Sequence, residues 1–275
     1  MKRLTILAAA LAATLTALGG SASGAAPAGL PTIDVSMTPT TIAVSGALQS
    51  GAVNIHSTTT SGDSEPTLVR LNPGVTGDQA LALLRSKAGQ DPNNVGKIGA
   101  IVFDADAPKG ASDVQTTLQP GNYLAIDTSG DNPAKFPTTT FTVTQASQPA
   151  SLPAANATVR GIDFAFTGPR TLHDGQVVRV ENDGFVVHMI AGIGVKNAKT
   201  ARKVTALLRA GKDNKAGKLA TGFVSFQGPA SPGAVQQGTL AAKPGIYVLA
   251  CFMDTQDGRE HTQIGMLRTI RIAKR

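Results

Sequence analysis

Apolar and polar residues alternate over short stretches of this chain, and the alternation predicts a protein built mainly from β-strands. Residues 177–181 alternate strictly, residues 182–184 read Asn-Asp-Gly and favour a turn, and residues 185–190 are expected to form the next strand. Further strands are expected at residues 223–226 and 247–252. Thr, Val and Gly are plentiful and tryptophan is absent, which also favours strands and turns over a helical bundle.

Helical spacing occurs at one place in each half of the chain. Residues 199–208 place Val204, Leu207 and Leu208 on one face, and Gly211 is a suitable stop. Residues 78–85 are expected to form the equivalent helix of the first half. Short strands separated by turn signals, with one helix inserted in each half, predict an all-β fold of two tandem Greek-key sandwiches.

One unit of sequence occurs twice, at an offset of 124 residues. Three anchors recur at this offset, namely Leu-x-x-Gly-x-Val at 48–53 and 172–177, Ala-Leu-Leu-Arg at 82–85 and 206–209, and Pro-Gly-x-Tyr at 120–123 and 244–247. Both copies end in a short alternating strand, at 141–143 and 270–272, where the offset has grown to 129. Anchors in phase indicate a duplicated unit, and the second copy is five residues longer after its Pro-Gly-x-Tyr run.

The chain is expected to consist of a leader and two domains. Residues 1–26 combine a basic start, an apolar run and a stretch of small residues, which predicts a secretory signal peptide without a lipoprotein cysteine. The repeats are predicted to cover residues 30–147 and 154–275, joined by a Pro- and Ser-containing linker. No later run approaches the roughly 20 apolar residues of a membrane helix, so we expect an exported protein without a transmembrane segment.

Positive charge is concentrated in the second repeat. Residues 151–275 contain 17 basic and 8 acidic residues, whereas residues 27–150 contain 6 and 10. Eight basic residues surround the second predicted helix, at Lys196, Lys199, Arg202, Lys203, Arg209, Lys212, Lys215 and Lys218. This basic region, residues 196–218, is either a solvated helix face or a docking surface for an acidic redox protein or an anionic cell-surface polymer. Nucleic acid is not expected, because no aromatic residues interleave with the charges.

Cys251 is the only cysteine of the chain, so an exported protein could not use it in an internal disulfide. His261 and Met266 follow it, and His188 lies in an expected strand. A thiolate, two imidazoles and a thioether together suit copper, which alternates between a softer and a harder oxidation state. Strand alternation places Cys251 on the same face as apolar residues, which would keep the thiolate dry. Met253 is a rival thioether donor, but it follows the cysteine too closely to share its face comfortably.

The order of these residues resembles that of the cupredoxin, or blue copper, family. In that family a first histidine follows an Asn/Gly turn, a cysteine ends a late strand, and a histidine and a methionine lie before the last strand. The resemblance covers residues 160–275 and implies a cupredoxin-like sandwich. It also implies one type 1 copper ion, with His188, Cys251 and His261 in a plane and Met266 as a weak axial ligand. The implied role is one-electron transfer or extracellular copper handling, with His261 near the surface as the electron exit.

The first repeat is expected to be a degenerate copy without ligands. At the offset of 124, Asp127 takes the place of Cys251 and Ser64 the place of His188. The five residues that this repeat lacks fall in the loop that would carry His261 and Met266. A packing requirement would appear in both copies, so loss of the whole set from one copy favours a metal site in the other.

Three other interpretations stay open from the sequence. A secreted or wall-associated binding module without metal would keep His188 and Cys251 far apart. A Cu(I) buffer would use the same ligands without electron transfer. Cys251 could act as a nucleophile with His261 as its base, although no oxyanion donor can be identified. Because four ligands leave no open position on the metal and no hydrolase motif is present, we expect that the protein is not an enzyme.

Overall fold

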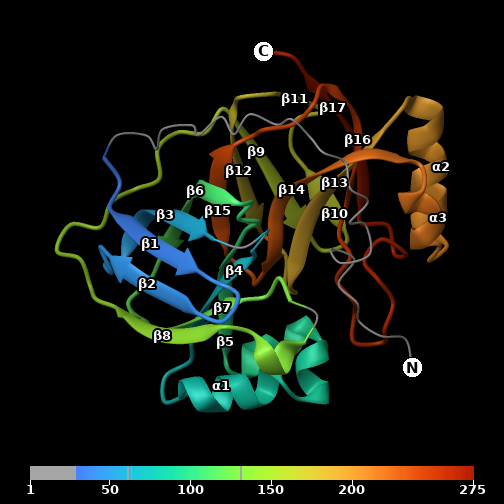
Figure 1. Cartoon of the computed structure of the whole chain (residues 1–275). Helices are drawn as coiled ribbons and strands as arrows, with labels where there is room; N and C mark the ends of the chain where they lie inside the picture. The colour runs from blue at the N-terminus through green and yellow to red at the C-terminus, as the bar shows by residue number, and fades with distance from the viewer. Residues whose placement is uncertain (1–28, 61, 63, 131) are drawn as a thin grey trace.

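The described chain is built around three β-sheets (Figure 1). The structure is a computed structural model that describes residues 29–60, 62, 64–130 and 132–275. The predicted signal peptide, residues 1–26, lies outside the described residues. Among the described residues, no helix is both long and apolar enough to cross a membrane.

The first repeat contributes eight of the described strands and one α-helix. Its strands are β1 (Thr32–Met37), β2 (Ile42–Gly46), β3 (Gly51–Thr59), β4 (Pro66–Leu71), β5 (Gly99–Asp104), β6 (Gly110–Leu118), β7 (Gly121–Asp127) and β8 (Thr138–Val143). Between β4 and β5 the chain forms α1 (Gly77–Leu84) and two 3-10 helices, η2 (Lys87–Gln90) and η3 (Pro92–Lys97), and η4 (Pro133–Lys135) follows β7.

The second repeat has a similar order of strands, with β11 as an additional one. Its strands are β9 (Ala157–Ile162), β10 (Ala165–Thr167), β11 (Thr171–His173), β12 (Val177–Asn182), β13 (His188–Val195), β14 (Ala220–Ala230), β15 (Val235–Thr239), β16 (Gly245–Ala250) and β17 (Leu267–Ala273). The inserted helices are α2 (Ala198–Arg209) and α3 (Asp213–Gly217). Each insertion is therefore one longer helix followed by shorter helical turns, whereas a single helix was expected.

The strands of each repeat form a two-layered sandwich, which confirms the predicted fold class. One sheet runs through both repeats, in the order β10-β9-β12-β15-β6-β3-β1-β2. The second layer of the first repeat is the sheet β5-β4-β7-β8, and that of the second repeat is β11-β17-β16-β13-β14. Alternate residues of β1, namely Ile33, Val35 and Met37, are buried in the first sandwich, as the alternating pattern requires.

Strand pairing reproduces the sequence repeat. Tyr123 pairs with Arg70 between β7 and β4, and Tyr247 pairs with Gly194 between β16 and β13, which is the same pair displaced by 124 residues. The tyrosines also act alike, since each hydroxyl donates to the carbonyl four residues earlier, Gln119 or Lys243, at 2.7 Å. The limits of the two domains remain a prediction, but the register establishes which positions of the two repeats are equivalent.

Equivalent strands of the two repeats meet where the sandwiches join. β6 and β15 occupy the same position in their repeats and pair antiparallel, which makes the large sheet continuous. β5 and β14 also meet there, where Ile101 and Ser231 exchange hydrogen bonds at 2.9 Å. The glutamines at this junction are almost completely buried, and Gln237 donates to Gln115 at 2.7 Å. The two repeats therefore share a hydrogen-bonded, largely dry boundary.

One predicted strand begins later than expected. Residues 185–190 were predicted to be strand, but β13 begins at His188. The N–H of Phe185 donates to the Asp163 carboxylate at 2.9 Å, and the N–H of Val187 donates to the Asn93 side chain at 3.0 Å. Because these donors are used by side chains, they are not available to a neighbouring strand.

Candidate metal centre

Three of the four predicted ligands converge in the second repeat. His188, Cys251 and His261 each offer one donor atom, and these atoms all lie within 4.8 Å of one another. The two Nδ1 atoms are 3.1 Å apart, and the Cys251 Sγ lies 3.3 Å from that of His261 and 3.8 Å from that of His188. Among the described residues this is the one group of three or more His, Cys, Asp or Glu donors close enough to share an ion.

The long segment between Cys251 and His261 folds back on itself and so returns the histidine to the cysteine. Asp254 and Glu260 form an antiparallel bridge, and the N–H of Thr255 donates to the Arg259 carbonyl at 2.8 Å. The N–H of His261 then donates to the Met253 carbonyl at 2.8 Å. Residues 253–261, named here the copper hairpin, therefore bring residues that are distant in sequence into adjacent positions.

His188 is placed by the turn that precedes its strand. The Asn182 side chain accepts the N–H of Gly184 at 3.0 Å and donates to the carbonyls of Val186 and Ala230. An added Cβ at Gly184 would lie 2.6 Å from the His188 Nε2 atom, so this position requires glycine for its lack of a side chain. The Asn-x-Gly sequence thus forms both the turn and the space for the imidazole.

A carboxylate outside the donor triangle orients the first imidazole. Asp163 lies 3.4 Å from the His188 Nε2 atom through its Oδ1, on the side of the ring away from Cys251. A carboxylate at the outer nitrogen leaves the inner nitrogen free to bind a metal. The N–H of Met189 donates to the Cys251 Sγ at 3.3 Å, so the sulfur position also receives a backbone hydrogen bond.

Met266 lies in the same fully buried cluster as Cys251. Its N–H donates to the His261 carbonyl at 2.8 Å, and its carbonyl accepts the N–H of Cys251 at 3.4 Å. Its methyl group lies 3.3 Å from the Cβ position of Gly161. The backbone of Met266 thus joins both ligand segments, while its role as an axial ligand stays a prediction. Met253, the rival donor, is only partly buried against this cluster.

The centre is dry, and burial sets the protonation of its groups. His188 is 1% exposed, and Cys251, His261 and Met266 are 0% exposed. Burial raises the pKa of the Cys251 thiol to about 12. Burial, followed by the repulsion of His188, lowers the pKa of His261 to about 4, and burial also lowers the pKa of His188. The imidazoles are therefore neutral at physiological pH, which is the form that binds metals.

Phe164 covers the second imidazole, which corrects one expectation. His261 was expected near the surface, but it is fully buried and its ring lies 5.1 Å from that of Phe164 at an edge-on angle of 79°. Phe164 is 37% exposed and adopts φ 61°, a left-handed conformation that is uncommon for a bulky residue. His261 is thus enclosed by the fold, and a partly exposed phenylalanine ring lies against its imidazole.

The donors fit copper. An ion held at about 2.0–2.3 Å in a trigonal plane keeps its donors roughly 3.5 Å apart, and the three observed separations of 3.1, 3.3 and 3.8 Å agree with this spacing. Two imidazole nitrogens and one cysteine sulfur, with a thioether in the same dry cluster, are the donor set of type 1 copper. The fold is cupredoxin-like, and His188, Cys251 and His261 are the residues that would hold one type 1 ion.

The equivalent place in the first repeat is built differently. The N–H of Glu65 donates to the Asp127 carboxylate at 3.0 Å, just as the N–H of Met189 donates to Cys251. Ser64 and Asp127 line a cavity of about 260 Å³ together with Lys135. This arrangement explains how the repeat keeps the fold without the ligands.

Comparison with known proteins finds similarity to solved structures at low sequence identity. No protein-family profile and no curated protein sequence matches it. Among solved structures it is similar to reduced auracyanin from Roseiflexus castenholzii, with 19% identity over 44% of this chain and 99% of that one, and a TM-score of 0.26. It is also similar to the Cu-containing nitrite reductase of Thermus scotoductus, with 10% identity over 88% and 61% of the chains and a TM-score of 0.24.

The expectation that the protein is not an enzyme is corrected by these comparisons. Solved structures similar to most of the chain include copper enzymes, among them a laccase from Pediococcus acidilactici, with 10% identity over 89% of this chain and 61% of that one, and a TM-score of 0.23. The sequence argument considered one closed four-ligand centre. Such a centre limits the chemistry at that copper and says nothing about the rest of a chain with two repeats.

Several residues that build the centre were not predicted from the sequence. Asp163, Phe164 and Asn93 act on His188, His261 and the segments around them, but each is distant in sequence from the residue that it contacts. The one feature of the sequence that could have drawn attention to Asp163 and Phe164 is their place in the short connection between β9 and β10.

Proposed function

We propose that the protein is an exported carrier of single electrons whose redox group is the copper of the second repeat. Copper supplies the one-electron chemistry when it is bound. The observation that supports the proposal is the convergence of His188, Cys251 and His261 on strands and on a hairpin closed by backbone hydrogen bonds. Donors held by such a backbone move little when the charge of the ion changes, which favours fast electron transfer.

The protein surroundings perform three tasks in this proposal. Burial excludes water from the donors, which prevents side reactions of the ion. Asp163 fixes the orientation of His188, and the N–H of Met189 stabilises negative charge on the Cys251 sulfur. Phe164 covers His261 with an aromatic ring at the surface, so an electron can pass over a short distance to a docked protein.

The test is to add Cu(II) to the purified full chain and record the visible spectrum, with Cys251→Ser as the control. We expect an intense thiolate-to-copper band at one ion per chain, and loss of that band in the variant. The band should then disappear and return with one electron per chain during a reductive and oxidative titration. Absence of the band would reject the copper site, and a band that does not cycle would favour copper storage over electron transfer.

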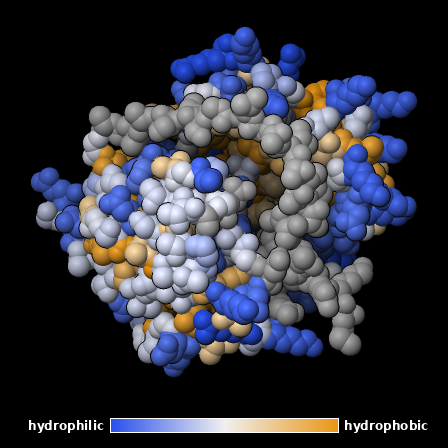
Figure 2. All heavy atoms as spheres, viewed as in Figure 1, coloured by the Kyte–Doolittle hydropathy of each residue, from blue (hydrophilic) through white to orange (hydrophobic). Residues whose placement is uncertain are grey.

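The basic region is proposed as the docking surface for an acidic redox protein. All eight lysines and arginines of residues 196–218 are exposed, and among the described residues none has an ion-pair partner. Hydrophilic residues gather on the side of the molecule where α2 and α3 lie (Figure 2). Gly211, between these helices, lies against the side chain of Gln263, two residues beyond His261. A partner docked there would therefore lie beside the copper hairpin.

Ionic strength tests this surface. Electron transfer to an acidic redox protein should slow as salt is added, because screening weakens the attraction between exposed charges. Reversal of Lys199 and Lys203 to Glu should remove most of that salt dependence, while reversal of the remote Lys243 and Lys274 should leave it. An unchanged salt dependence in the first variant would reject the surface, and retention of the chain on cell walls through the same lysines would indicate the polymer instead.

Export is proposed from residues 1–26 alone. Mass spectrometry of the protein recovered from the producing cells and from their medium tests it. A chain that stays inside the cell with its first 26 residues attached would contradict the proposal.

A further inference from the structure

The first repeat reaches the copper centre through the 3-10 helix η3. Asp91 caps this helix by accepting the N–H of Asn93 at 2.9 Å, and Pro92 fixes its first position. The side chain of the neighbouring Asn94 donates instead to the Ala88 carbonyl at 2.8 Å. The backbone of Asn93 is therefore fixed within its own repeat, while its side chain is free to bond elsewhere.

The Asn93 side chain connects the two segments that carry the copper ligands. Its Oδ1 accepts the N–H of Val187 at 3.0 Å, immediately before His188. Its Nδ2 donates to the Asp254 carbonyl at 3.2 Å, within the copper hairpin. One amide thus bridges the start of the His188 strand and the hairpin between Cys251 and His261, and both bonds fix its orientation.

Apolar contacts support the same connection. Val187 is 3% exposed and packs in the core of the first repeat, with Val95 of η3 among its members. Met253 is partly buried against the cores of both repeats. Residues beside two of the predicted ligands, His188 and Cys251, are therefore embedded in a core that belongs to the other repeat.

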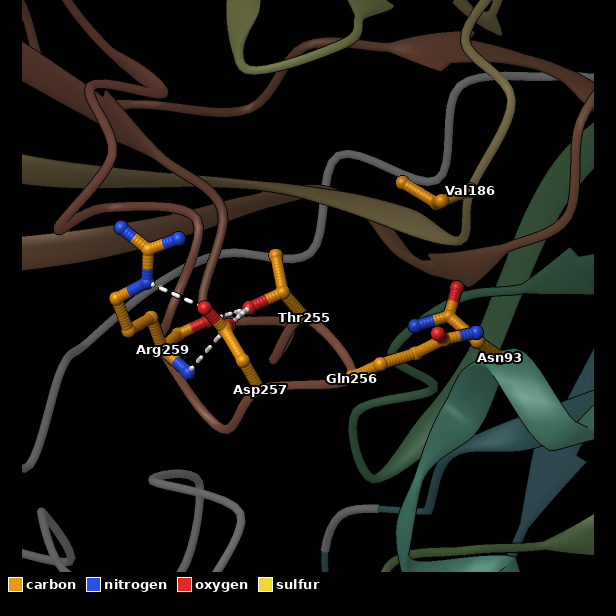
Figure 3. A pocket seen from close by; sticks show the side chains of 6 residues that line it. All are labelled: Asn93, Val186, Thr255, Gln256, Asp257 and Arg259. Atoms are coloured by element: carbon orange, nitrogen blue, oxygen red, sulfur yellow. Dashed lines mark hydrogen bonds and ion pairs between the residues drawn. The ribbon is translucent and has the colours of Figure 1, made fainter.

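The connection lies at the edge of a surface cavity of about 430 Å³. Figure 3 shows Asn93 and Val186 on one side of it and the hairpin residues Thr255, Asp257 and Arg259 on the other. Beyond Asn93 the hairpin is therefore open to solvent and held mainly by its own bonds. Among the described residues, the hydrogen bond from Asn93 to the Asp254 carbonyl joins this hairpin to the first repeat.

Comparison of the two repeats shows that only the first repeat can make this contact. At the offset of 124, the position of Asn93 is occupied by Gly217 in the second repeat, which has no side chain to form such a bond. The first repeat in turn has no ligand set to be supported. Asn93 is thus present in the repeat that lacks the metal and acts on the repeat that has the ligands.

We propose that Asn93 is a positioning residue for the copper centre, through which the metal-free first repeat holds the ligand segments of the second in place. The inference rests on the copper site proposed above. In this view the two repeats are coupled, because tightening of the copper hairpin by the metal also tightens its bond to the first repeat, and loosening of that bond speeds release of the metal.

The test compares three full-length variants, Asn93→Ala, Asn93→Asp and Asn94→Ala. Asn94 is a matched control, because its side chain bonds only within residues 88–94. Asn93→Ala removes both bonds, and we expect copper to transfer to a strong chelator roughly 10-fold faster, with a shifted visible band. Asn93→Asp keeps an acceptor for the Val187 N–H but loses the donor to Asp254, so it should release copper faster than wild type. Asn94→Ala should match wild type.

Hydrogen exchange of the copper-free chain gives a readout that does not depend on metal. The Val187 amide should exchange faster in Asn93→Ala and stay protected in Asn93→Asp and Asn94→Ala. If the wild-type chain binds no copper, the proposed function fails, while this exchange result still reports on the bonds of Asn93 to Val187 and Asp254. If copper binds but Asn93→Ala matches Asn94→Ala in exchange and release rate, the positioning role is rejected.

Discussion

Three neighbours, one aspartate and two glycines, decide where the His188 imidazole can lie. Asp163 holds its outer nitrogen, Gly184 leaves room for its ring, and Gly161 packs against its Cβ and against the Met266 methyl group. These residues offer no donor to the metal. They restrict a side chain that does, and restriction of the first imidazole is what keeps the donor triangle small.

At this scale we predict that Gly184→Ala weakens copper binding. The added Cβ would lie 2.6 Å from the His188 Nε2 and 2.7 Å from the Asp163 Oδ1, so the imidazole must move out of the triangle. Copper affinity, measured by competition with a chelator, should fall by roughly 10- to 100-fold. Gly222→Ala, where nothing lies within 4 Å of the added group, is the control. Equal affinities in the two variants would contradict the prediction.

The four predicted ligands could be found from residue type and order, because a lone cysteine with two histidines and a methionine is chemically distinctive. Their surroundings could not be found in this way. Asp163 is 25 residues from His188, and Asn93 is 94 residues from Val187. Neither contact can therefore be recognised from the residues near it in the sequence. The burial of His261 was missed for a related reason, because a polar loop sequence does not show that the fold encloses its histidine.

At the scale of elements, the strand that begins with Pro-Gly-x-Tyr is fixed at its start by the tyrosine. Tyr123 is fully buried, donates to the Gln119 carbonyl, accepts the Gln119 N–H at 3.1 Å and stacks on Phe141. Tyr247 makes only the donor bond, to Lys243. The strand β16 ends next to Cys251, so the position of the tyrosine helps to set where the thiol lies.

We predict that Tyr123→Phe destabilises the protein more than Tyr247→Phe. The first change leaves two backbone groups without their partner, and the free energy of unfolding should fall by about 1–3 kcal/mol. The second change removes one bond from a less enclosed site and should cost about 1 kcal/mol. Urea unfolding of the copper-free chain measures both. A larger loss for Tyr247→Phe would show that the two tyrosines do not act as the structure suggests.

Elements were predictable wherever their signal is local. The alternation at 177–181 and the helical spacing at 199–208 correspond to β12 and α2 within a few residues. The start of β13 was not predictable, since the N–H groups of Phe185 and Val187 are taken by side chains from other parts of the chain. The 3-10 helices η2 and η3 were also missed, because turns of this length have no periodicity to detect.

At the scale of the molecule, the junction of the repeats buries a carboxyl group. Asp104 ends β5 and is 2% exposed, its Oδ2 accepts the Thr67 hydroxyl at 2.5 Å, and its side chain lies against Gly228 of β14. Burial raises its pKa well above the ordinary 3.8, and the nearby Glu65 and Asp106 carboxylates raise it further. The pairing of β6 with β15 was not predictable from the sequence. Its glutamines, such as Gln236, are polar residues that are buried only because the two strands pair.

We predict that Asp104→Asn raises the melting temperature more at about pH 8 than at about pH 4. The unfolded chain loses the Asp104 proton near the ordinary pKa, whereas the folded chain retains it to higher pH. The wild type therefore loses stability as pH rises from the ordinary pKa through the raised one. Asparagine does not ionise, so its advantage should grow with pH to about 2–8 °C. A difference that stays constant or shrinks with rising pH would contradict this.

The paired hydrogen bonds of Met189 to Cys251 and of Glu65 to Asp127 bear on how the two repeats diverged. In both repeats the same backbone N–H meets an acceptor that can hold negative charge, a sulfur in one and a carboxylate in the other. A duplicated copy could therefore exchange a metal-binding side chain for an acidic one without leaving this backbone donor unsatisfied. A change between cysteine and aspartate at this position therefore costs the strand no backbone hydrogen bond, whatever happens to the other ligand positions.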